Sequence, residues 1–150
     1  MANIDPDQFE LETFLPFELH QASEALSQSF AKIYRDGYGM TRTEWRVFAH
    51  LGQKGAMTAT QIGAAAKLHK TKVSRAVYSL EQRKWLTRTD NSEDRRVQTL
   101  HLTTLGQSTF KKLSSDALNF NLKLKQQLGA ETFDSALTLL RKIQDYEQSS

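Results

Sequence analysis

Two short threonine motifs fix where two helices of this chain begin. Residues 41–44 read Thr-Arg-Thr-Glu and residues 58–61 read Thr-Ala-Thr-Gln. In each motif the threonine can cap a helix while the residue three positions later reaches back to its amide. We expect the first helix to stop near residues 52–55, where two glycines stand. The apolar stripes of these two helices are Trp45, Phe48, Ala49 and Leu51 in the first, and Ile62, Ala65 and Ala66 in the second.

A basic segment follows the second motif. A turn at about residues 67–69 should lead into a further helix over about residues 70–84. Two short helices joined by a tight turn, the second of them basic, fit the helix-turn-helix pattern.

Hydrophobic periodicity predicts long helices at both ends of the chain. Near the amino terminus the apolar residues are spaced three, four, four and three apart, and glycines end the run. A fifth helix should begin after Thr103 and end near Gly129, and a sixth should cover about residues 131–147. The apolar stripes are Leu19, Ala22, Leu26, Phe30 and Ile33 in the first of these helices, ended by Gly37 and Gly39; Leu105, Phe110, Leu113, Ala117, Phe120 and Leu124 in the fifth; and Phe133, Leu137, Leu140 and Ile143 in the last.

Between these helices the chain has the composition of a β-hairpin. Residues 85–90 and 97–102 are typical of strands, and they flank a polar loop at 91–96 that contains two arginines. The expected fold is therefore mostly α with a small two-stranded β-wing: a winged helix-turn-helix with helical extensions at both ends.

Charge is distributed unevenly along the 150 residues, although the net charge is only +3. Residues 1–24 hold six carboxylates and no Lys or Arg, whereas residues 67–88 hold seven cations against Glu81 alone. A basic segment of this kind suggests a polyanion partner such as nucleic acid. The alternative is a solvated helix face with no such partner.

Other features of the composition exclude several classes of protein. The absence of cysteine excludes disulfides, thiolate metal sites and a Cys nucleophile. No apolar run reaches the roughly eighteen residues of a membrane span, and the acidic residues 1–12 do not resemble a secretion signal. We therefore expect a soluble, cytoplasmic protein.

The basic helix at 70–84 has two distinct faces. Val73, Val77 and Leu80 fall within about 60° of one another on a helical wheel and should pack on the preceding helix. The remaining faces carry hydroxyl, cationic and aromatic side chains, which can bind phosphates and read base edges. The expected DNA contacts from this helix are Lys70, Thr71, Lys72, Ser74, Arg75 and Tyr78.

The loop of the hairpin supplies a second candidate contact. Arg95 and Arg96 at its tip could enter an adjacent minor groove, where narrow A·T-rich DNA attracts arginine. Asp94 would repel phosphate unless it braces one of these arginines, or Arg75 or Arg88, by a charge-assisted hydrogen bond. The alternative is a solvated loop with no fixed partner.

Four short segments of the chain form a recognisable set. They are residues 44–47 (Glu-Trp-Arg-Val), 72–75 (Lys-Val-Ser-Arg), 94–96 (Asp-Arg-Arg) and 102–106 (Leu-Thr-Thr-Leu-Gly). Together they resemble the MarR family of bacterial transcriptional regulators, over roughly residues 14–146. The resemblance implies a homodimer that represses genes from pseudo-palindromic operators, in many members until a phenolic or aromatic carboxylate ligand binds. It also implies that residues 1–36 and 103–150 form dimerisation helices around a winged helix-turn-helix at 41–102. By this match Thr71, Lys72, Ser74 and Arg75 take recognition positions and Asp94 and Arg96 take wing positions. The cysteine-based peroxide sensing of one branch is excluded.

A candidate ligand site lies where the first long helix should meet the helix that starts after Thr41, between the dimer interface and the DNA-reading half. An aromatic-walled pocket there could hold a carboxylate on Arg46 or His20. The alternative is that these side chains simply form core. The candidate ligand residues are Phe17, His20, Trp45, Arg46 and Phe48.

An enzyme is the main competing class of protein. The four histidines are scattered, and we find no metal-ligand pair, Gly-rich phosphate loop, nucleophile elbow or carboxylate dyad. We therefore expect no catalytic residues, metal or cofactor, although His69 could contact a phosphate at the start of the basic helix. A third alternative is a helical protein-interaction module, or a ligand-binding protein, whose basic face does not bind DNA specifically. The histidines are His20, His50, His69 and His101.

Overall fold

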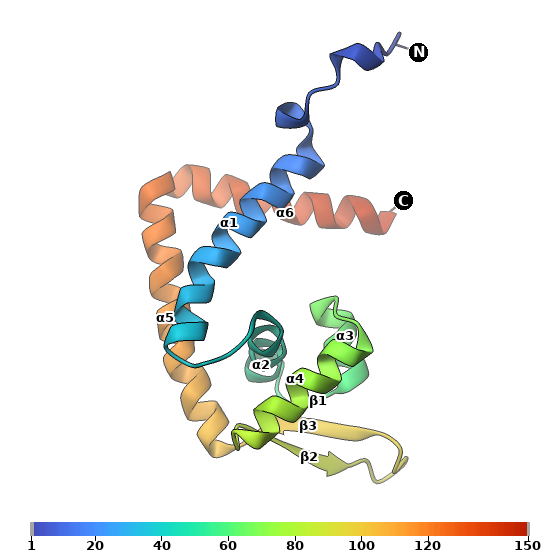
Figure 1. Ribbon diagram of the computed structural model, residues 1–150, viewed down its shortest axis with the longest axis vertical. Helices are drawn as coiled ribbons and strands as arrows, with labels where there is room; N and C mark the ends of the chain where they lie inside the picture. Colours follow the sequence, from blue (N-terminus) through green and yellow to red (C-terminus); the bar gives the residue numbers. More distant parts are fainter. Residues whose placement is uncertain (1, 150) are drawn as a thin grey trace.

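The computed structural model describes residues 2–149, with side chains to Tyr146, and it is mostly helical, as predicted (Figure 1). Two short 3-10 turns precede six helices and three strands. In chain order these are η1 (Pro6–Gln8), η2 (Leu11–Thr13), α1 (Leu15–Asp36), α2 (Arg42–Lys54), β1 (Met57–Thr58), α3 (Ala59–Ala66), α4 (Lys70–Gln82), β2 (Leu86–Asp90), β3 (Gln98–Leu102), α5 (Thr104–Leu128) and α6 (Ala130–Ser149).

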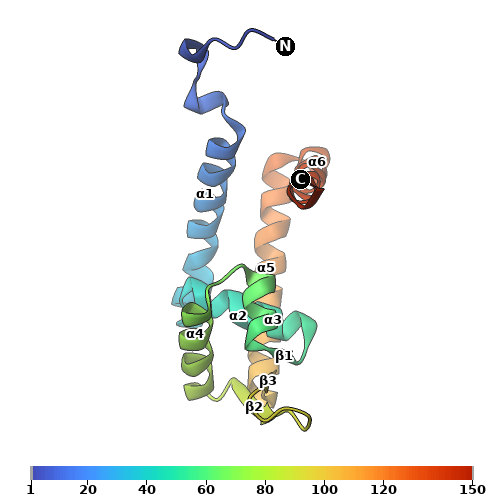
Figure 2. The same ribbon diagram turned by 90° about the vertical axis from the view of Figure 1, so that its right-hand side faces the viewer.

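The elements separate into a winged unit and a set of long helices. Helices α2, α3 and α4 pack together beside the three strands at one end of the molecule (Figures 1 and 2). Helices α1 and α5 lead away from that unit, and α6 crosses at the far end, where both chain termini also lie. This arrangement is a winged helix-turn-helix with helical extensions at both ends.

Both threonine motifs form the capping boxes that the sequence predicts. The Thr41 hydroxyl accepts a hydrogen bond from the Glu44 amide at 3.2 Å, and the Glu44 carboxylate accepts one from the Thr41 amide. Thr58 and Gln61 make the same reciprocal pair at the start of α3. Because these caps satisfy amides that the first helical turn leaves unpaired, the motifs predict the two helix starts correctly.

The core lies inside the winged unit and centres on α2. Phe48 is fully buried, with its ring centroid 5.5 Å from that of Trp85 and 5.7 Å from that of Phe110 on α5. Burying such a side chain contributes about 1.5–3 kcal/mol to the stability of the fold. Around Phe48 the buried residues include Val47 and Leu51 of α2, Ile62 of α3, Val73, Val77 and Leu80 of α4, Leu86 and Leu100 of the sheet, and Leu113 of α5.

The predicted two-stranded wing is present as the hairpin of β2 and β3, and a short third strand that the sequence did not predict joins it. β1 pairs antiparallel with β3, with Met57 opposite Leu100 and Thr58 opposite Thr99, and the strand order is β1-β3-β2. β1 is only two residues long, too short to show the alternating pattern that identifies a strand. Thr58 both pairs with β3 and caps α3, which fixes the helix-turn-helix to the wing.

One helix end differs from expectation and one agrees. Helix α2 ends at Lys54, within the expected range, and Gly55 caps it with φ 82°. Gly52 lies inside the helix, where a Cβ would come to 2.5 Å from ring atoms of Phe110. Glycine is present there for close packing and does not stop the helix. Helix α4 ends at Gln82, two residues early, and Lys84 takes a left-handed conformation with φ 65° that turns the chain into β2.

The long helices leave apolar side chains exposed. Leu118 and Leu122 of α5 are 70% and 53% exposed, and Leu26 of α1, which belongs to the predicted stripe, is also exposed. Leu137, Leu139 and Leu140 of α6 are exposed as well. Among the residues that the structure describes, no helix is long and apolar enough to cross a membrane.

Gly106, in the first turn of α5, leaves no space for a side chain. A Cβ at this position would lie 2.0 Å from the backbone oxygen of Trp85, which also accepts a hydrogen bond from the Thr103 amide. Because backbone atoms must shift, Gly106→Ala should lower the free energy of unfolding in urea by about 1–3 kcal/mol. Ser108→Ala, an exposed substitution on the same helix, should change it by less than about 0.5 kcal/mol. Equal effects would contradict the close packing of α5 on the wing.

Candidate nucleic-acid interface

The turn between α3 and α4 presents one face of α4 to the outside. Lys67 caps α3 in a left-handed conformation with φ 53°, and the Leu68 amide donates to the Gly63 carbonyl at 2.9 Å. Two residues later α4 begins. Its buried residues are Val73, Ala76, Val77 and Leu80, so the apolar face lies where the helical wheel places it.

The predicted DNA-contacting side chains of α4 all lie on the exposed surface. Tyr78 is 61% exposed, a large fraction for an aromatic side chain. Within the described part of the chain, no hydrogen bond or ion pair occupies the side chains of this set. The set is Lys70, Thr71, Lys72, Ser74, Arg75 and Tyr78. The surface therefore offers cationic, hydroxyl and phenolic groups that are available to an external partner.

The amino terminus of α4 concentrates positive charge. A helix begins with unpaired amides and the positive end of its dipole, so acidic residues usually stabilise the first turn. The first turn of α4 instead contains Lys70 and Lys72 and no acid. This electrostatic arrangement favours an anion supplied from outside the chain, as phosphate is at many helix amino termini.

His69 caps this helix. Its ring Nδ1 accepts a hydrogen bond from the Thr71 amide at 3.4 Å. A neutral ring that accepts through Nδ1 carries its proton on Nε2, which is then able to donate outward. Among the described residues, no group of three or more His, Asp or Glu side chains lies close enough to hold a metal ion.

The two arginines at the hairpin tip differ in their hydrogen bonds. Asp94 accepts hydrogen bonds from the Arg96 side chain at 3.1 and 3.3 Å and from the Arg96 amide at 3.0 Å. These bonds hold the pKa of the Asp94 carboxyl below its usual value. Arg96 stays 91% exposed while it is paired. Arg95 is exposed as well and makes no such pair within residues 2–149.

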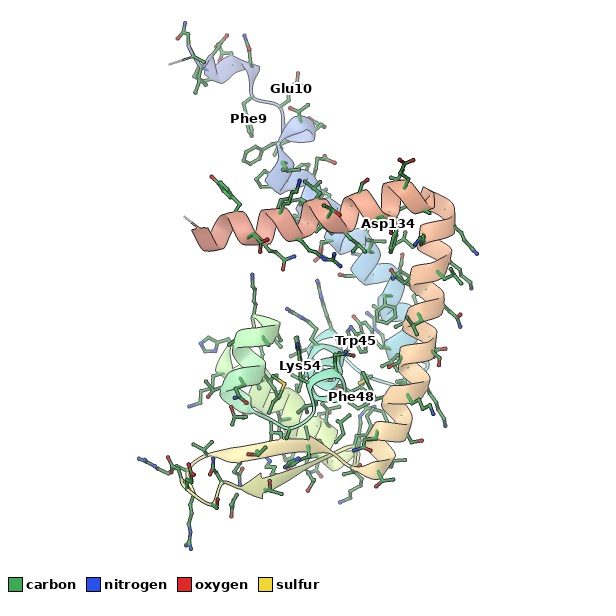
Figure 3. All side chains as sticks on the ribbon, turned by 180° about the vertical axis from the view of Figure 1, so that it is seen from behind. Phe9, Glu10, Trp45, Phe48, Lys54 and Asp134 are labelled. Atoms are coloured by element: carbon green, nitrogen blue, oxygen red, sulfur yellow. The ribbon has the colours of Figure 1, made fainter. Side chains whose placement is uncertain are left out.

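The predicted ligand residues do not form one cluster in this chain. Phe48 is buried in the core, and the Arg46 guanidinium donates to the carbonyl of Ala66 at the end of α3. Trp45 packs against two rings of α1, with centroids 5.1 Å from Phe30 and 6.0 Å from Tyr34. Figure 3 shows Trp45 and Phe48 where α2 lies beside α5.

The other two residues of that set lie farther along α1. Phe17 is 13 residues and His20 is 10 residues before Phe30, which is about 20 and 15 Å along the helix axis. The ligand pocket therefore remains a prediction, and a single chain does not assemble it.

Part of this chain matches a known protein family in sequence. The sequence model described as MarR family matches residues 38–97. These residues run from the connection between α1 and α2 to the loop of the wing. No curated relative matches the chain. The winged helix-turn-helix of this chain is therefore similar in sequence to the MarR family.

Solved structures extend the likeness to the long helices. The transcriptional regulator PA4135 is 27% identical with a TM-score of 0.79, and the match covers 88% of this chain and 96% of that one. A MarR/EmrR family regulator from Acinetobacter sp. ADP1 is 23% identical with a TM-score of 0.82, covering 95% of this chain and all of the other. BpsR from Bordetella bronchiseptica, whose DNA binding 6-hydroxynicotinic acid regulates, is 20% identical with a TM-score of 0.80, covering 91% and 97%. The chain thus has the fold of MarR-family transcriptional regulators.

A network of polar side chains that joins the wing to α4 was not predicted from the sequence. Arg88 of β2 donates to the Glu81 carboxylate of α4 at 3.1 Å and to Gln98 of β3 at 3.4 Å. Gln98 in turn donates to Asp90 at 3.2 Å. The available signal was that Glu81 is the one acid in the basic segment, and its role is to hold Arg88 in place.

The pairing at the tip of the wing can be tested by titration. Because Arg96 stabilises the charged form of Asp94, NMR should give this carboxyl a titration midpoint below the ordinary Asp value of about 3.9. Arg96→Gln should raise the midpoint toward that value. Arg95→Gln removes the same charge one residue away and should leave it nearly unchanged. Equal responses to the two substitutions would show that Asp94 has no preferred partner.

Proposed function

We propose that this chain is a sequence-specific double-stranded DNA-binding transcriptional regulator, and that it acts as a homodimeric repressor on a pseudo-palindromic operator. The observation that carries the proposal is the exposed face of α4, which is cationic and unpaired although most other arginines of the chain are held by internal partners. Five arginines donate within the chain, whereas Arg75 on α4 has no such partner among the described residues. The five are Arg42, Arg46, Arg83, Arg88 and Arg96.

The division of contacts follows from chemistry and position. The amino-terminal half of α4 fits the major groove, with Lys70 and Lys72 on phosphates and Thr71 and Ser74 near base edges. Arg75 can donate two parallel hydrogen bonds to a guanine, which neither lysine can do. Tyr78 adds an aromatic surface beside it.

The wing supplies the second contact. Arg95 is the arginine free to enter the minor groove, and the Asp94–Arg96 pair shapes the loop that presents it. Under this proposal Asp94 stabilises the conformation of the tip without itself binding DNA.

A homodimer accounts for the exposed leucines of the long helices. Contiguous exposed apolar side chains of this kind mark an interaction surface, and a second copy of the chain would cover them by two-fold symmetry. We assign residues 1–36 and 103–150 to dimerisation and residues 41–102 to DNA reading. Two copies of α4 about 34 Å apart would then meet half-sites about 10 bp apart.

DNA reading by Arg75 is tested on an operator selected from a pool of random duplexes. Arg75→Ala should weaken binding to that operator by about 1–3 kcal/mol and relax the preference at one base pair. Fluorescence anisotropy on single-base variants of the operator measures both effects. Arg35→Ala, which removes an exposed arginine from the end of α1, is the matched control and should bind like the parent. Normal discrimination by Arg75→Ala would remove Arg75 from base readout.

The dimer is tested by sedimentation at micromolar concentration. The parent chain should sediment as a dimer, and Leu118→Glu with Leu122→Glu should give a folded monomer, because buried unpaired carboxylates oppose association. Gln53→Glu with Lys54→Glu adds acidic residues to exposed positions on α2 and should leave the dimer intact. A monomeric parent, or a dimer that survives both leucine substitutions, would contradict the assignment.

The proposed regulation is release from DNA by a small aromatic acid. The regulation of BpsR by such a compound supports this choice, as does the position of Trp45 between the winged unit and α1. Because Phe17 and His20 lie far from Trp45 along α1, we place the pocket at the dimer interface, with Arg46 or His20 as the partner of the carboxylate.

Titration calorimetry with 6-hydroxynicotinate tests this regulation. A ligand shifts DNA binding only if its affinity differs between the free and DNA-bound protein, and typical coupling corresponds to about 5- to 150-fold. The free protein should therefore bind the compound more tightly than the protein–operator complex does, and Arg46→Ala should bind it more weakly. Equal affinities in the two titrations would mean that the compound does not regulate DNA binding.

A further inference from the structure

The connection between α1 and α2 is held by side chains from two distant elements. On one side, the Tyr38 hydroxyl donates to the Asp116 carboxylate of α5 at 2.6 Å. On the other side, the guanidinium of Arg83, the residue that ends α4, donates to the backbone carbonyls of Tyr38 and Gly39. Tyr38 is thus bonded through its ring to a long helix and through its backbone to the end of the recognition helix.

Further contacts fix the guanidinium of Arg83. It lies 3.8 Å from the Glu44 carboxylate, which also belongs to the capping box of α2, and 5.0 Å above the Trp85 ring. Gly39 has φ 65°, and a Cβ there would come to 3.4 Å from the guanidinium nitrogens. The backbone between α1 and α2 therefore has the conformation that lets the Arg83 guanidinium reach its carbonyl groups.

The hydroxyl side of the arrangement is equally well defined. Burial, together with the hydrogen bond to Asp116 and the charge of that carboxylate, raises the pKa of Tyr38 to about 12. The Tyr38 hydroxyl therefore keeps its proton, and can donate to Asp116, throughout the physiological pH range.

We infer that Arg83 and Tyr38 are positioning residues, which fix the angle of the DNA-reading unit on the long helices and so set which half-site spacing the dimer accepts. This inference rests on the proposed function for its consequence on DNA. The physical reason is that the apolar contacts between α2 and the long helices are non-directional, whereas a planar guanidinium bonded to two carbonyls permits one orientation. A small rotation at this joint would move the two recognition helices in opposite directions.

The first test compares the selected operator with a version that has one base pair inserted at its centre. The parent protein should bind the longer site much more weakly. Arg83→Gln and Tyr38→Phe should reduce this discrimination by roughly 2- to 30-fold, the range found for substitutions along coupling networks. Binding to random duplex, which does not depend on spacing, should change little in Tyr38→Phe.

Matched substitutions separate positioning from general damage. Arg35→Gln removes the same charge from an exposed arginine of α1 and should keep full discrimination. Asp116→Asn retains an acceptor for the Tyr38 hydroxyl and should also keep it, whereas Asp116→Ala should lose it. Full discrimination in Tyr38→Phe and Asp116→Ala, with the folded state intact, would overturn the inference.

A second measurement needs no DNA. The absence of native cysteine allows spin labels at Ser74→Cys on α4 and Asn121→Cys on α5, diluted with unlabelled protein so that pairs within one chain dominate. Pulsed electron resonance should give a narrow distance distribution in the parent and a broader or shifted one in Tyr38→Phe and Arg83→Gln. If the parent protein does not bind DNA, the proposed function is wrong. The distance measurement still tests whether Tyr38 and Arg83 fix the orientation of the winged unit on the long helices. Unchanged distributions in both variants would refute the inference.

Discussion

The packing of Phe110 on α2 is the interaction on which the rest of this structure depends. Its ring meets Phe48 edge to face and lies flat against Gly52, so α5 approaches α2 as closely as a backbone without a side chain permits. Edge-to-face aromatic pairs contribute about 0.5–1.5 kcal/mol beyond the area they bury. Because α2 also carries the core contacts to α3 and α4, this crossing connects the core of the DNA-reading unit to a long helix.

Ion pairs within the chain separate the arginines that shape the winged unit from the cations that stay available on its surface. Three acidic residues of the winged unit pair with arginines that shape it: Glu81 holds Arg88, Asp94 holds Arg96, and Glu44 faces Arg83. Within the described part of the chain, the cations on the exposed face of α4 and Arg95 at the wing tip make no ion pair. A surface pair between exposed side chains contributes little to stability, usually below about 1 kcal/mol, so these pairs matter chiefly for the shape they give the interface.

The sequence predicts the parts of the fold that depend on neighbouring residues. Caps at Thr41, Thr58 and Thr103 locate helix starts because the bonds they make are local, and the two faces of α4 follow from its period. The features that were missed depend on residues far apart in the chain. β1 exists because β3 lies beside it, and the absence of a side chain at Gly52 is explained only by Phe110 of α5.

The candidate sites divide in the same way. The exposed residues of α4 could be identified because a helix of known register has only one buried face. The partners of Arg46 and Arg83 are backbone carbonyls, which carry no signal in the sequence. The ligand residues were grouped by the expectation that α1 and α2 meet, but α1 spans 22 residues, and only its second half lies against Trp45.

The central claim is that the unpaired cations of α4 and the wing bind the phosphates of duplex DNA. The most direct measurement is the affinity for a random duplex as the salt concentration is varied. We predict a linear fall of log K with log salt, with a slope of about −0.9 for each phosphate neutralised, reduced by about 1–2 units for each wing in a variant with Arg95→Ala and Arg96→Ala. Absence of binding at low salt, or an affinity independent of salt, would contradict this claim and would favour a helical protein-interaction module whose basic face does not bind DNA.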